Sequence, residues 1–262
     1  MSYQNIEVEL DGGLQIVRLN RPDAYNALNE GLGQDLLDAV IQADVNPQVR
    51  ALMVTGNGKA FCAGGDVKRM VESGDGVSAV VHHLTVYLHA LVSRMVRMQK
   101  PVIMAVNGPA AGAGLSLAMA GDIVLATESA KFTSAYTQIG ASPDGSSTFF
   151  LARILGIRRA LELVYTNRVL SAQEAEAWGM LTRVLPDKDF LAAATAFAQE
   201  LAAGPTLAYG KSKDLLYHSQ NNDLEAQMER ETQCIVASTK TEDFRNGTKA
   251  FVAKQKPTYH GR

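Results

Sequence analysis

The 262-residue sequence predicts an α/β fold with a helical C-terminal region. Short apolar runs typical of buried strands alternate with segments of helical periodicity along most of the chain. After about residue 205 the patterns are wholly helical. Apolar residues make up 47% of the chain, so one sizeable core can be buried at this length. We therefore expect a core over residues 1–204 and a helical region over residues 205–262 that packs on the core or on another subunit.

The first elements are a hairpin, a helix and a strand. Residues 6–19 form two alternating segments on either side of an Asp-Gly-Gly turn at 11–13, which predicts a β-hairpin. Residues 29–44 follow with helical spacing. Their apolar side chains share one face of that helix: Leu32, Leu36, Leu37, Val40 and Ile41. The apolar run at 50–56 then predicts a buried strand.

The same order repeats in the middle of the chain. A long apolar helix is expected over residues 80–99, a strand over 101–108, a helix of small residues from about 112 and strands within 122–134. Three helical segments are predicted in the tail, at residues 207–220, 223–238 and 242–254. Each tail helix has too little apolar surface to form a core alone, so the tail is expected to need another surface.

Charge, cysteine content and hydropathy exclude several classes of protein. The chain has 25 Lys and Arg against 27 Asp and Glu, a formal charge of -2, which predicts no nucleic-acid partner. Cys62 and Cys234 lie far apart and outside any metal-binding spacing, so we expect no metal site and a reducing cytoplasm. The N-terminus lacks a signal-peptide pattern, and no run approaches the roughly 18 apolar residues of a membrane span. A membrane role is therefore not expected.

Two glycine-rich stretches, residues 60–70 and 107–122, each run from a strand or loop into a helix. Small residues there let backbone N–H groups approach a ligand, and the first N–H groups of a helix lack partners within it. Two such donors that converge on one oxygen would form an oxyanion hole. The alternative is that the glycines serve only tight turns and close packing.

Asp144 is the one charged residue in the stretch YTQIGASPDGSS, residues 136–147. Pro143 fixes its own φ and favours a turn before the helical segment that follows. One interpretation makes Asp144 the N-cap of that helix, since an Asp oxygen accepts backbone N–H groups there. The other makes it a catalytic acid or base beside the oxyanion hole, and a lone carboxylate near a charge-stabilising site favours this second interpretation.

Five stretches together resemble the enoyl-CoA hydratase/isomerase family, or crotonase superfamily. They are LNRPDAYNALN, GNGKAFCAGGDVKRM, KPVIMAVNGPAAGAGLSLAMAGDIVLATESAKF, NRVLSAQEAEAWGMLTRVLP and FVAKQKP. They occur in this order and span nearly the whole chain. The resemblance implies a spiral of ββα turns, a C-terminal helical region for trimerisation, and acyl-CoA thioester substrates. Coenzyme A then enters as part of the substrate, without a further cofactor, and the partners are copies of the chain in a trimer or a dimer of trimers.

The resemblance also assigns site residues. The oxyanion-hole amides fall on Gly65 and Ala113. The residues that it assigns to coenzyme A are Ala24 and Ala63, Lys68 near the phosphates, and Phe251 and Lys254, which would reach the coenzyme A of a neighbouring subunit.

Departures from the family pattern narrow the expected reaction. Where a typical hydratase has two glutamates, this chain has Ser116 and Tyr136, which makes ordinary hydration doubtful. Asp144 matches the catalytic aspartate of isomerases that act on dienoyl-CoA and on ring-epoxide phenylacetyl-CoA. We therefore expect an enoyl-CoA isomerase in which Asp144 moves a proton through an enolate. Ser116→Ala is expected to do little.

Two other functions stay open. His89 matches the base of 4-chlorobenzoyl-CoA dehalogenase, in which the aspartate matching Asp144 attacks the ring, but Tyr136 and Gly65 replace a Trp and a Phe of that enzyme. His89 is otherwise a packed helix residue, and Tyr136 either bonds the carboxylate, lines the acyl pocket or only packs. The third function is an acyl-CoA binding scaffold without activity, which would have no use for Asp144.

Overall fold

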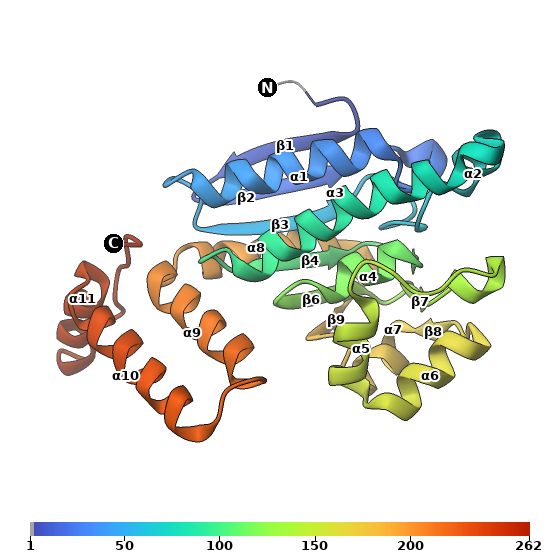
Figure 1. Ribbon diagram of the computed structural model, residues 1–262. Helices are drawn as coiled ribbons and strands as arrows, with labels where there is room; N and C mark the ends of the chain where they lie inside the picture. Colours follow the sequence, from blue (N-terminus) through green and yellow to red (C-terminus); the bar gives the residue numbers. More distant parts are fainter. Residues whose placement is uncertain (1–2) are drawn as a thin grey trace.

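The computed structural model describes residues 3–262 and has a sheet between layers of helices (Figure 1). Its strands are β1 Ile6–Asp11, β2 Leu14–Leu19, β3 Ala51–Gly56, β4 Val102–Val106, β5 Ala110–Ala111, β6 Ile123–Thr127, β7 Lys131–Thr133, β8 Leu170–Ser171 and β9 Arg183–Leu185. Its α-helices are α1 Glu30–Val45, α2 Val67–Glu72, α3 Val77–Arg97, α4 Ala113–Met119, α5 Ser147–Leu155, α6 Ile157–Thr166, α7 Ala172–Ala177, α8 Phe190–Ala202, α9 Thr206–Ser219, α10 Leu224–Thr239 and α11 Glu242–Val252. Short 3₁₀ turns lie at Pro22–Ala24, Gly74–Gly76, Tyr136–Ile139 and Asp187–Asp189.

Six strands form the main sheet in the order β1-β2-β3-β4-β6-β9, and β5, β7 and β8 form a smaller one. The first pair is antiparallel and every later pair in the main sheet is parallel. Alternate residues of β3 face opposite ways: Leu52 and Val54 join the core with α1 and α3, whereas Ala51 and Met53 pack with α8. Both faces of the sheet are therefore covered, as parallel strands require.

The predicted hairpin is confirmed, with Asp11 paired to Leu14 across a two-residue turn. Gly12 and Gly13 both have positive φ, 55° and 90°, a conformation that other residues adopt at a cost. The predicted first helix begins one residue after Asn29, whose side chain caps it by accepting the Leu32 N–H at 2.9 Å. Local sequence patterns therefore account for these elements.

The long helix α3 carries an apolar face into the core and crosses the molecule toward α2 (Figure 1). Leu88, Leu91 and Met95 are buried on that face, and the helix packs against α1. The segment Gly74–Arg97 is also long and apolar enough to span a membrane by length and composition, although no such run was expected. Only 22% of its apolar window is buried, and one helix of this kind is weak evidence for a membrane span.

The C-terminal helices α9 to α11 form the helical region that was predicted, and they extend from one end of the sheet (Figure 1). Lys213 of α9 anchors them: its Nζ lies 2.7 Å from Asp122 Oδ2 and donates to the Met95 carbonyl at 2.6 Å. Burial raises the pKa of Asp122 and lowers the pKa of Lys213, although each charge partly offsets the effect on the other. By contrast, α10 has no buried residue at all.

Candidate active site

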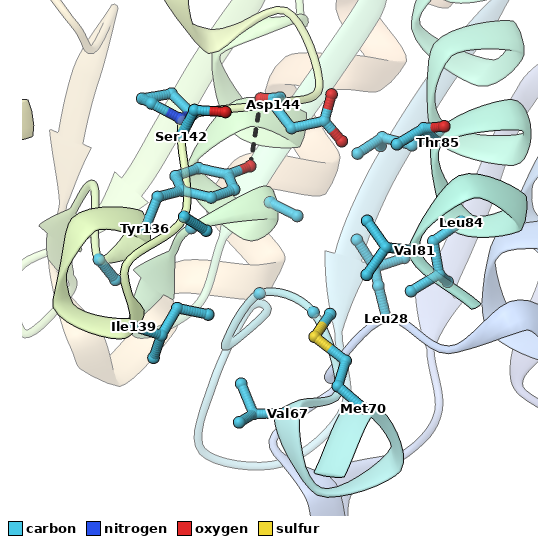
Figure 2. Close-up of a pocket in the computed structure, with 18 of the residues that line it drawn as sticks. Leu28, Val67, Met70, Val81, Leu84, Thr85, Tyr136, Ile139, Ser142 and Asp144 are labelled. Carbon is cyan, nitrogen blue, oxygen red and sulfur yellow. Dashed lines mark hydrogen bonds between the residues drawn. The ribbon is translucent and has the colours of Figure 1, made fainter. Parts of the chain in front are cut away.

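A cavity of about 650 Å³ opens between α2, α3, the N-terminus of α4 and the segment that carries Asp144. Figure 2 shows Met70 and Val67 reaching into it from α2, Val81 and Leu84 from α3, and Ile139 from the opposite wall. Its remaining lining includes the two glycine-rich segments, Ala63 to Gly65 and Gly112 to Ala113. The cavity thus brings together four of the predicted catalytic residues: Gly65, Ala113, Tyr136 and Asp144.

Gly65 lines this cavity, and the pairing of its neighbours leaves its N–H free. Leu28 N–H donates to the Gly64 carbonyl at 2.7 Å, and Asp66 N–H donates to the Leu28 carbonyl at 2.8 Å. This is a parallel bridge between Leu28 and Gly65. In such a bridge the middle residue turns its own N–H away from the partner. Within residues 3–262 the Gly65 N–H has no hydrogen-bond partner.

Ala113 supplies the second free donor. It is the first residue of α4, and a first helical N–H lacks a partner within its helix. No acceptor among the described residues replaces that partner. Gly112, just before it, has φ 52° and ψ −124°, a conformation that side chains disfavour. This glycine is therefore required to aim the Ala113 N–H.

The two donor segments lie directly against each other. A Cβ placed on Gly64 would stand 2.9 Å from the Ala111 carbonyl oxygen and 3.5 Å from the Ala113 nitrogen. Gly64 also has φ 101°. The close approach of these backbones lets the two free N–H groups share one ligand oxygen, as an oxyanion hole requires.

Asp144 is not a helix cap, which corrects the first interpretation of this residue. Helix α5 begins at Ser147, and its N-cap position, Ser146, makes no side-chain cap bond. The Asp144 carboxylate instead extends across the cavity toward Thr85 of α3 (Figure 2). Its Oδ1 lies 2.6 Å from His89 Nε2. His89 and Asp144 are 55 positions apart in the sequence, and the fold brings their side chains together.

Tyr136 lines the cavity, but its hydroxyl does not bond the Asp144 carboxylate. It donates to the Asp144 main-chain carbonyl at 3.1 Å, the dashed contact in Figure 2. Burial raises the pKa of Tyr136 to about 12, so the hydroxyl keeps its proton as a donor. Ser116 Oγ lies 3.0 Å from the same hydroxyl and 2.7 Å from the same carbonyl. Ser116 and Tyr136 therefore meet behind the aspartate.

The predicted coenzyme A residues divide into two groups. Ala63 lines the cavity. Ala24 ends the 3₁₀ turn Pro22–Ala24, and the carbonyl of the next residue, Tyr25, accepts the Ala63 N–H at 3.0 Å. Lys68 is on α2, with its side chain 86% exposed and 3.9 Å from Glu72. Phe251 is in the last turn of α11 and Lys254 follows that helix by two residues. Figure 1 shows α11 at the opposite end of the molecule from α2. In this chain Phe251 and Lys254 do not approach its own cavity.

Sequence reasoning missed one ion pair that supports the site. Asp66, next to Gly65, caps α2 through the Arg69 N–H at 3.1 Å and pairs with Arg21 at 2.9 Å. Burial alone would raise the pKa of Asp66, but the Arg69 N–H and the Arg21 guanidinium outweigh it and lower that pKa. An aspartate just before a helix is a recognisable cap signal, whereas its pairing with Arg21 depends on the fold.

Among the described residues, no three His, Cys, Asp or Glu side chains gather as metal ligands. Cys62 is buried beneath the oxyanion segment, and burial raises the pKa of its thiol to about 12. This thiol is therefore not a nucleophile at neutral pH.

Comparison with known proteins places these features in a family. A profile of the Enoyl-CoA hydratase/isomerase family matches residues 9–262. The 1,2-epoxyphenylacetyl-CoA isomerase of Escherichia coli is 35% identical over 254 residues, 97% of each chain. An Arthrobacter 4-chlorobenzoyl coenzyme A dehalogenase-2 is 35% identical over 257 residues, 97% of this chain and 92% of the relative. The crystal structure of an enoyl-CoA hydratase from Bacillus anthracis superposes with a TM-score of 0.93 at 31% identity, covering 99% and 100% of the two chains.

The chain belongs to the enoyl-CoA hydratase/isomerase family and is an enzyme of that family. The superposition confirms the predicted crotonase-type fold with its helical C-terminal region. An acyl-CoA substrate is consistent with the family. These three relatives carry three different activities, so the residues of this chain's own cavity have to distinguish among them.

Proposed function

We propose that this protein is an acyl-CoA isomerase that shifts the double bond of an enoyl-CoA. The observation that carries the proposal is that Asp144 is the one charged residue among the described residues that line the cavity. Hydration by a glutamate pair would need two carboxylates there, and hydroxyls occupy both positions. A single carboxylate opposite two free N–H donors is the equipment for moving one proton.

The reaction balances with these groups alone. The thioester oxygen binds between the N–H groups of Gly65 and Ala113. The Asp144 carboxylate takes a proton from C2 of a 3-enoyl-CoA, and the electron pair left behind forms an enolate at that oxygen. The protonated Asp144 then returns the proton at C4, which restores the carbonyl and gives a 2-enoyl-CoA. Loss of one oxyanion donor typically costs about 2.7 to 4 kcal/mol, so the two amides supply much of the rate enhancement.

The acyl group that fits best is apolar. Leu28, Val67, Met70, Val81 and Leu84 face the cavity around the reaction centre (Figure 2). Coenzyme A takes part only as the carrier of this acyl group, and the proposed role of Lys68 on α2 is to contact its phosphates. No further cofactor enters the steps above.

A substrate screen in D₂O tests the proposal. We expect turnover of at least one 3-enoyl-CoA, with deuterium entering at C2 or C4 of the product. Thioester binding without turnover of any enoyl-CoA would contradict the proposal and favour an acyl-CoA binding scaffold. Addition of water across the double bond as the main reaction would favour a hydratase.

One contact favours a second candidate, a hydrolytic dehalogenase. His89 Nε2 lies 2.6 Å from Asp144 Oδ1, with the His89 side chain 57% exposed. In such an enzyme Asp144 would attack the ring carbon, expel chloride and form an aryl ester, and His89 would activate the water that hydrolyses it. The dehalogenase relatives give this candidate weight.

Isotope labelling separates the two mechanisms. In a single turnover in ¹⁸O-water, hydrolysis of an aryl ester leaves one labelled oxygen in the Asp144 carboxylate, whereas a proton carrier gains none. We expect no label in the Asp144 peptide with an enoyl-CoA or a halogenated benzoyl-CoA. Label with the benzoyl substrate, and trapping of the ester by His89→Gln, would replace the isomerase with the dehalogenase.

We also propose that the chain assembles as a trimer or a dimer of trimers through α9 to α11. These helices leave large apolar side chains exposed, among them Leu216, Leu224, Ile235 and Val236. Exposed apolar stripes of this kind favour burial against another subunit. Light scattering at micromolar concentration is expected to give a trimer or hexamer, and a stable active monomer would contradict both the assembly and a role of Phe251 and Lys254 at a neighbour's site.

A further inference from the structure

The proposed reaction leaves two polar side chains next to the aspartate without a role. Ser116 is completely buried in α4, and Tyr136 lies half-buried in the cavity wall. A buried hydroxyl is costly unless it forms hydrogen bonds, so the partners of these two groups indicate what they do. Ser116 Oγ lies 3.2 Å from the Gly112 carbonyl of its own helix, but its shortest contact, like the carbonyl contact of Tyr136, is on the segment that carries the proposed base.

The shared partner is the main-chain carbonyl of Asp144. Ser116 Oγ donates to it at 2.7 Å, Tyr136 OH at 3.1 Å and Ser147 Oγ at 3.1 Å. Ser116 Oγ and Tyr136 OH are also 3.0 Å apart, so the two hydroxyls can form one chain of hydrogen bonds that ends on this carbonyl. Each hydroxyl has one proton, so Ser116 and Tyr136 either both donate to this carbonyl or one donates to it through the other, and Ser147 adds a further donor.

That peptide group starts a turn that is unfavourable by itself. Gly145 and Ser146 both adopt left-handed conformations, with φ 62° and 68°. For a serine this conformation is uncommon, and residues held in it depend on the surrounding structure. The space is also tight, because a Cβ on Gly145 would stand 3.0 Å from Ser116 Cβ and 2.6 Å from Leu88 Cδ2. The turn thus depends on anchors outside it.

The main anchor belongs to the helix that supplies an oxyanion donor. Ala113 is the first residue of α4, and Ser116 follows it by three positions, about 4.5 Å along the axis. All seven residues of α4 are buried, which keeps the helix rigid. The free N–H of Ala113 and the hydroxyl that holds Asp144 therefore move as one body.

We propose that Ser116 and Tyr136 are positioning residues, which set the place of the Asp144 carboxylate relative to the Ala113 amide. This inference rests on the proposed function, because it takes Asp144 as the group that moves the proton. Neither hydroxyl contacts the reacting atoms; both act through the Asp144 carbonyl. The expectation that Ser116→Ala does little is replaced by a specific loss of turnover.

Kinetics of Ser116→Ala and Tyr136→Phe test this role. We expect kcat to fall about 10-fold in each, since displacement of a reacting group by 1 Å can cost up to about 100-fold. KM should stay within about twofold, because the oxyanion amides and the acyl pocket are retained. The double variant should lose less than the product of the two single effects, since both act on one carbonyl.

Ser171→Ala is the matched control. Ser171 caps α7 through the Glu174 N–H, so its loss should cost about 1 kcal/mol of stability without touching the cavity. If the loss of kcat in the two test variants only follows lowered stability, Ser171→Ala will show the same loss, and the positioning role is wrong. Full kcat in both test variants would overturn it as well.

A measurement without substrate completes the test. Amide hydrogen exchange in the peptide around residues 141–149 should be several-fold faster in Ser116→Ala than in wild type and unchanged in Ser171→Ala. Equal exchange in all three would overturn the anchoring. Failure of the proposed function can be told apart from failure of the positioning role. If Asp144→Asn stays active, the proposed proton transfer is wrong. If Asp144→Asn is inactive while Ser116→Ala and Tyr136→Phe are fully active, only the positioning role is rejected.

Discussion

The two sides of the cavity are built in different ways. On the proposed oxyanion side the candidate donors are backbone amides, next to glycines at 64 and 112 that have positive φ angles. On the aspartate side the functional group is one side chain, and hydroxyls from α4 and from the Tyr136 turn hold its peptide group. The first side depends on the absence of side chains and the second on specific side chains.

This difference determines how each side can fail. Only proline removes a backbone N–H, so every other substitution damages the oxyanion side by displacement, which also strains the fold. A carboxylate can be replaced by an isosteric amide, so the aspartate side can lose its chemistry while its shape is kept. Mutations on the two sides should therefore separate turnover from stability.

The largest expected effect is on the aspartate side. Asp144→Asn should lower isomerase turnover at least about 100-fold, the scale of a lost general base, and leave folding and thioester binding intact. Steady-state kinetics with an enoyl-CoA, together with circular dichroism and thioester binding, measure this. Asp44→Asn, which changes an exposed ion pair with Arg94, is the control. Near-wild-type activity would remove Asp144 from the mechanism.

On the oxyanion side, Gly64→Ala should lower both the stability of the fold and the turnover. The new Cβ would stand 2.9 Å from the Ala111 carbonyl oxygen at a residue with φ 101°, so we expect a loss of about 1–3 kcal/mol in the free energy of unfolding. The shifted peptide should also lower kcat about 10-fold, because the Gly65 donor is misplaced.

Gly12→Ala is the matched control for strain. Gly12 also has positive φ, but a Cβ there would meet nothing within 4 Å, and it lies in the hairpin turn. The Gly12→Ala variant should be less stable than wild type, with an unchanged kcat. An equal fall of kcat in both variants would show that strain, and not the place of the Gly65 amide, limits turnover.

A smaller effect concerns the ion pair beneath the oxyanion segment. Asp66→Asn keeps a capping oxygen but loses the charge that pairs with Arg21, so it should cost about 1–2 kcal/mol near neutral pH. The pKa of Asp66 is lowered below its ordinary 3.8, so its contribution is complete above that value and is lost as the pH falls through the folded-state pKa.

Urea unfolding of wild type and Asp66→Asn at pH 7, 4 and 3 checks the direction of this pH dependence of stability. The difference between the two proteins should be largest at pH 7 and should shrink with acid. A difference that stays constant to pH 3 would mean that the carboxylate charge of Asp66 contributes nothing.

The smallest effect is expected at Lys68, on the helix that follows the oxyanion segment. Its side chain is 86% exposed, and an exposed charge contact contributes less than about 1 kcal/mol. Lys68→Ala should raise KM about two- to fivefold with kcat unchanged, and the difference should vanish at high salt. Lys188→Ala, on a surface turn outside the cavity lining, is the control; an equal rise in KM there would contradict a specific contact with the phosphates.

The fold could be predicted well because its signals are local. Alternating and helical periodicities place β1 to β4, α1 and α3, and the resemblance to a known family supplies their arrangement. Glycine-rich turns before helices are visible in the chain, but only the resemblance assigned the oxyanion-hole amides to Gly65 and Ala113. The short pattern around Asp144 fits a helix cap and a catalytic group equally well, so the prediction of a catalytic role depends on the neighbouring oxyanion segment and on the resemblance.

The sequence by itself determined the elements and the lone carboxylate, because backbone conformation and periodicity depend on near neighbours. The assignment of the two amide donors needed the family resemblance as well. Only the tertiary structure joined Asp144 to His89 and to the hydroxyls of Ser116 and Tyr136. It also paired Asp66 with Arg21, 45 residues away. Hydrogen bonds act over about 3 Å in space and carry no signal along the chain, so which side chains meet is decided by the packing of the sheet and its helices.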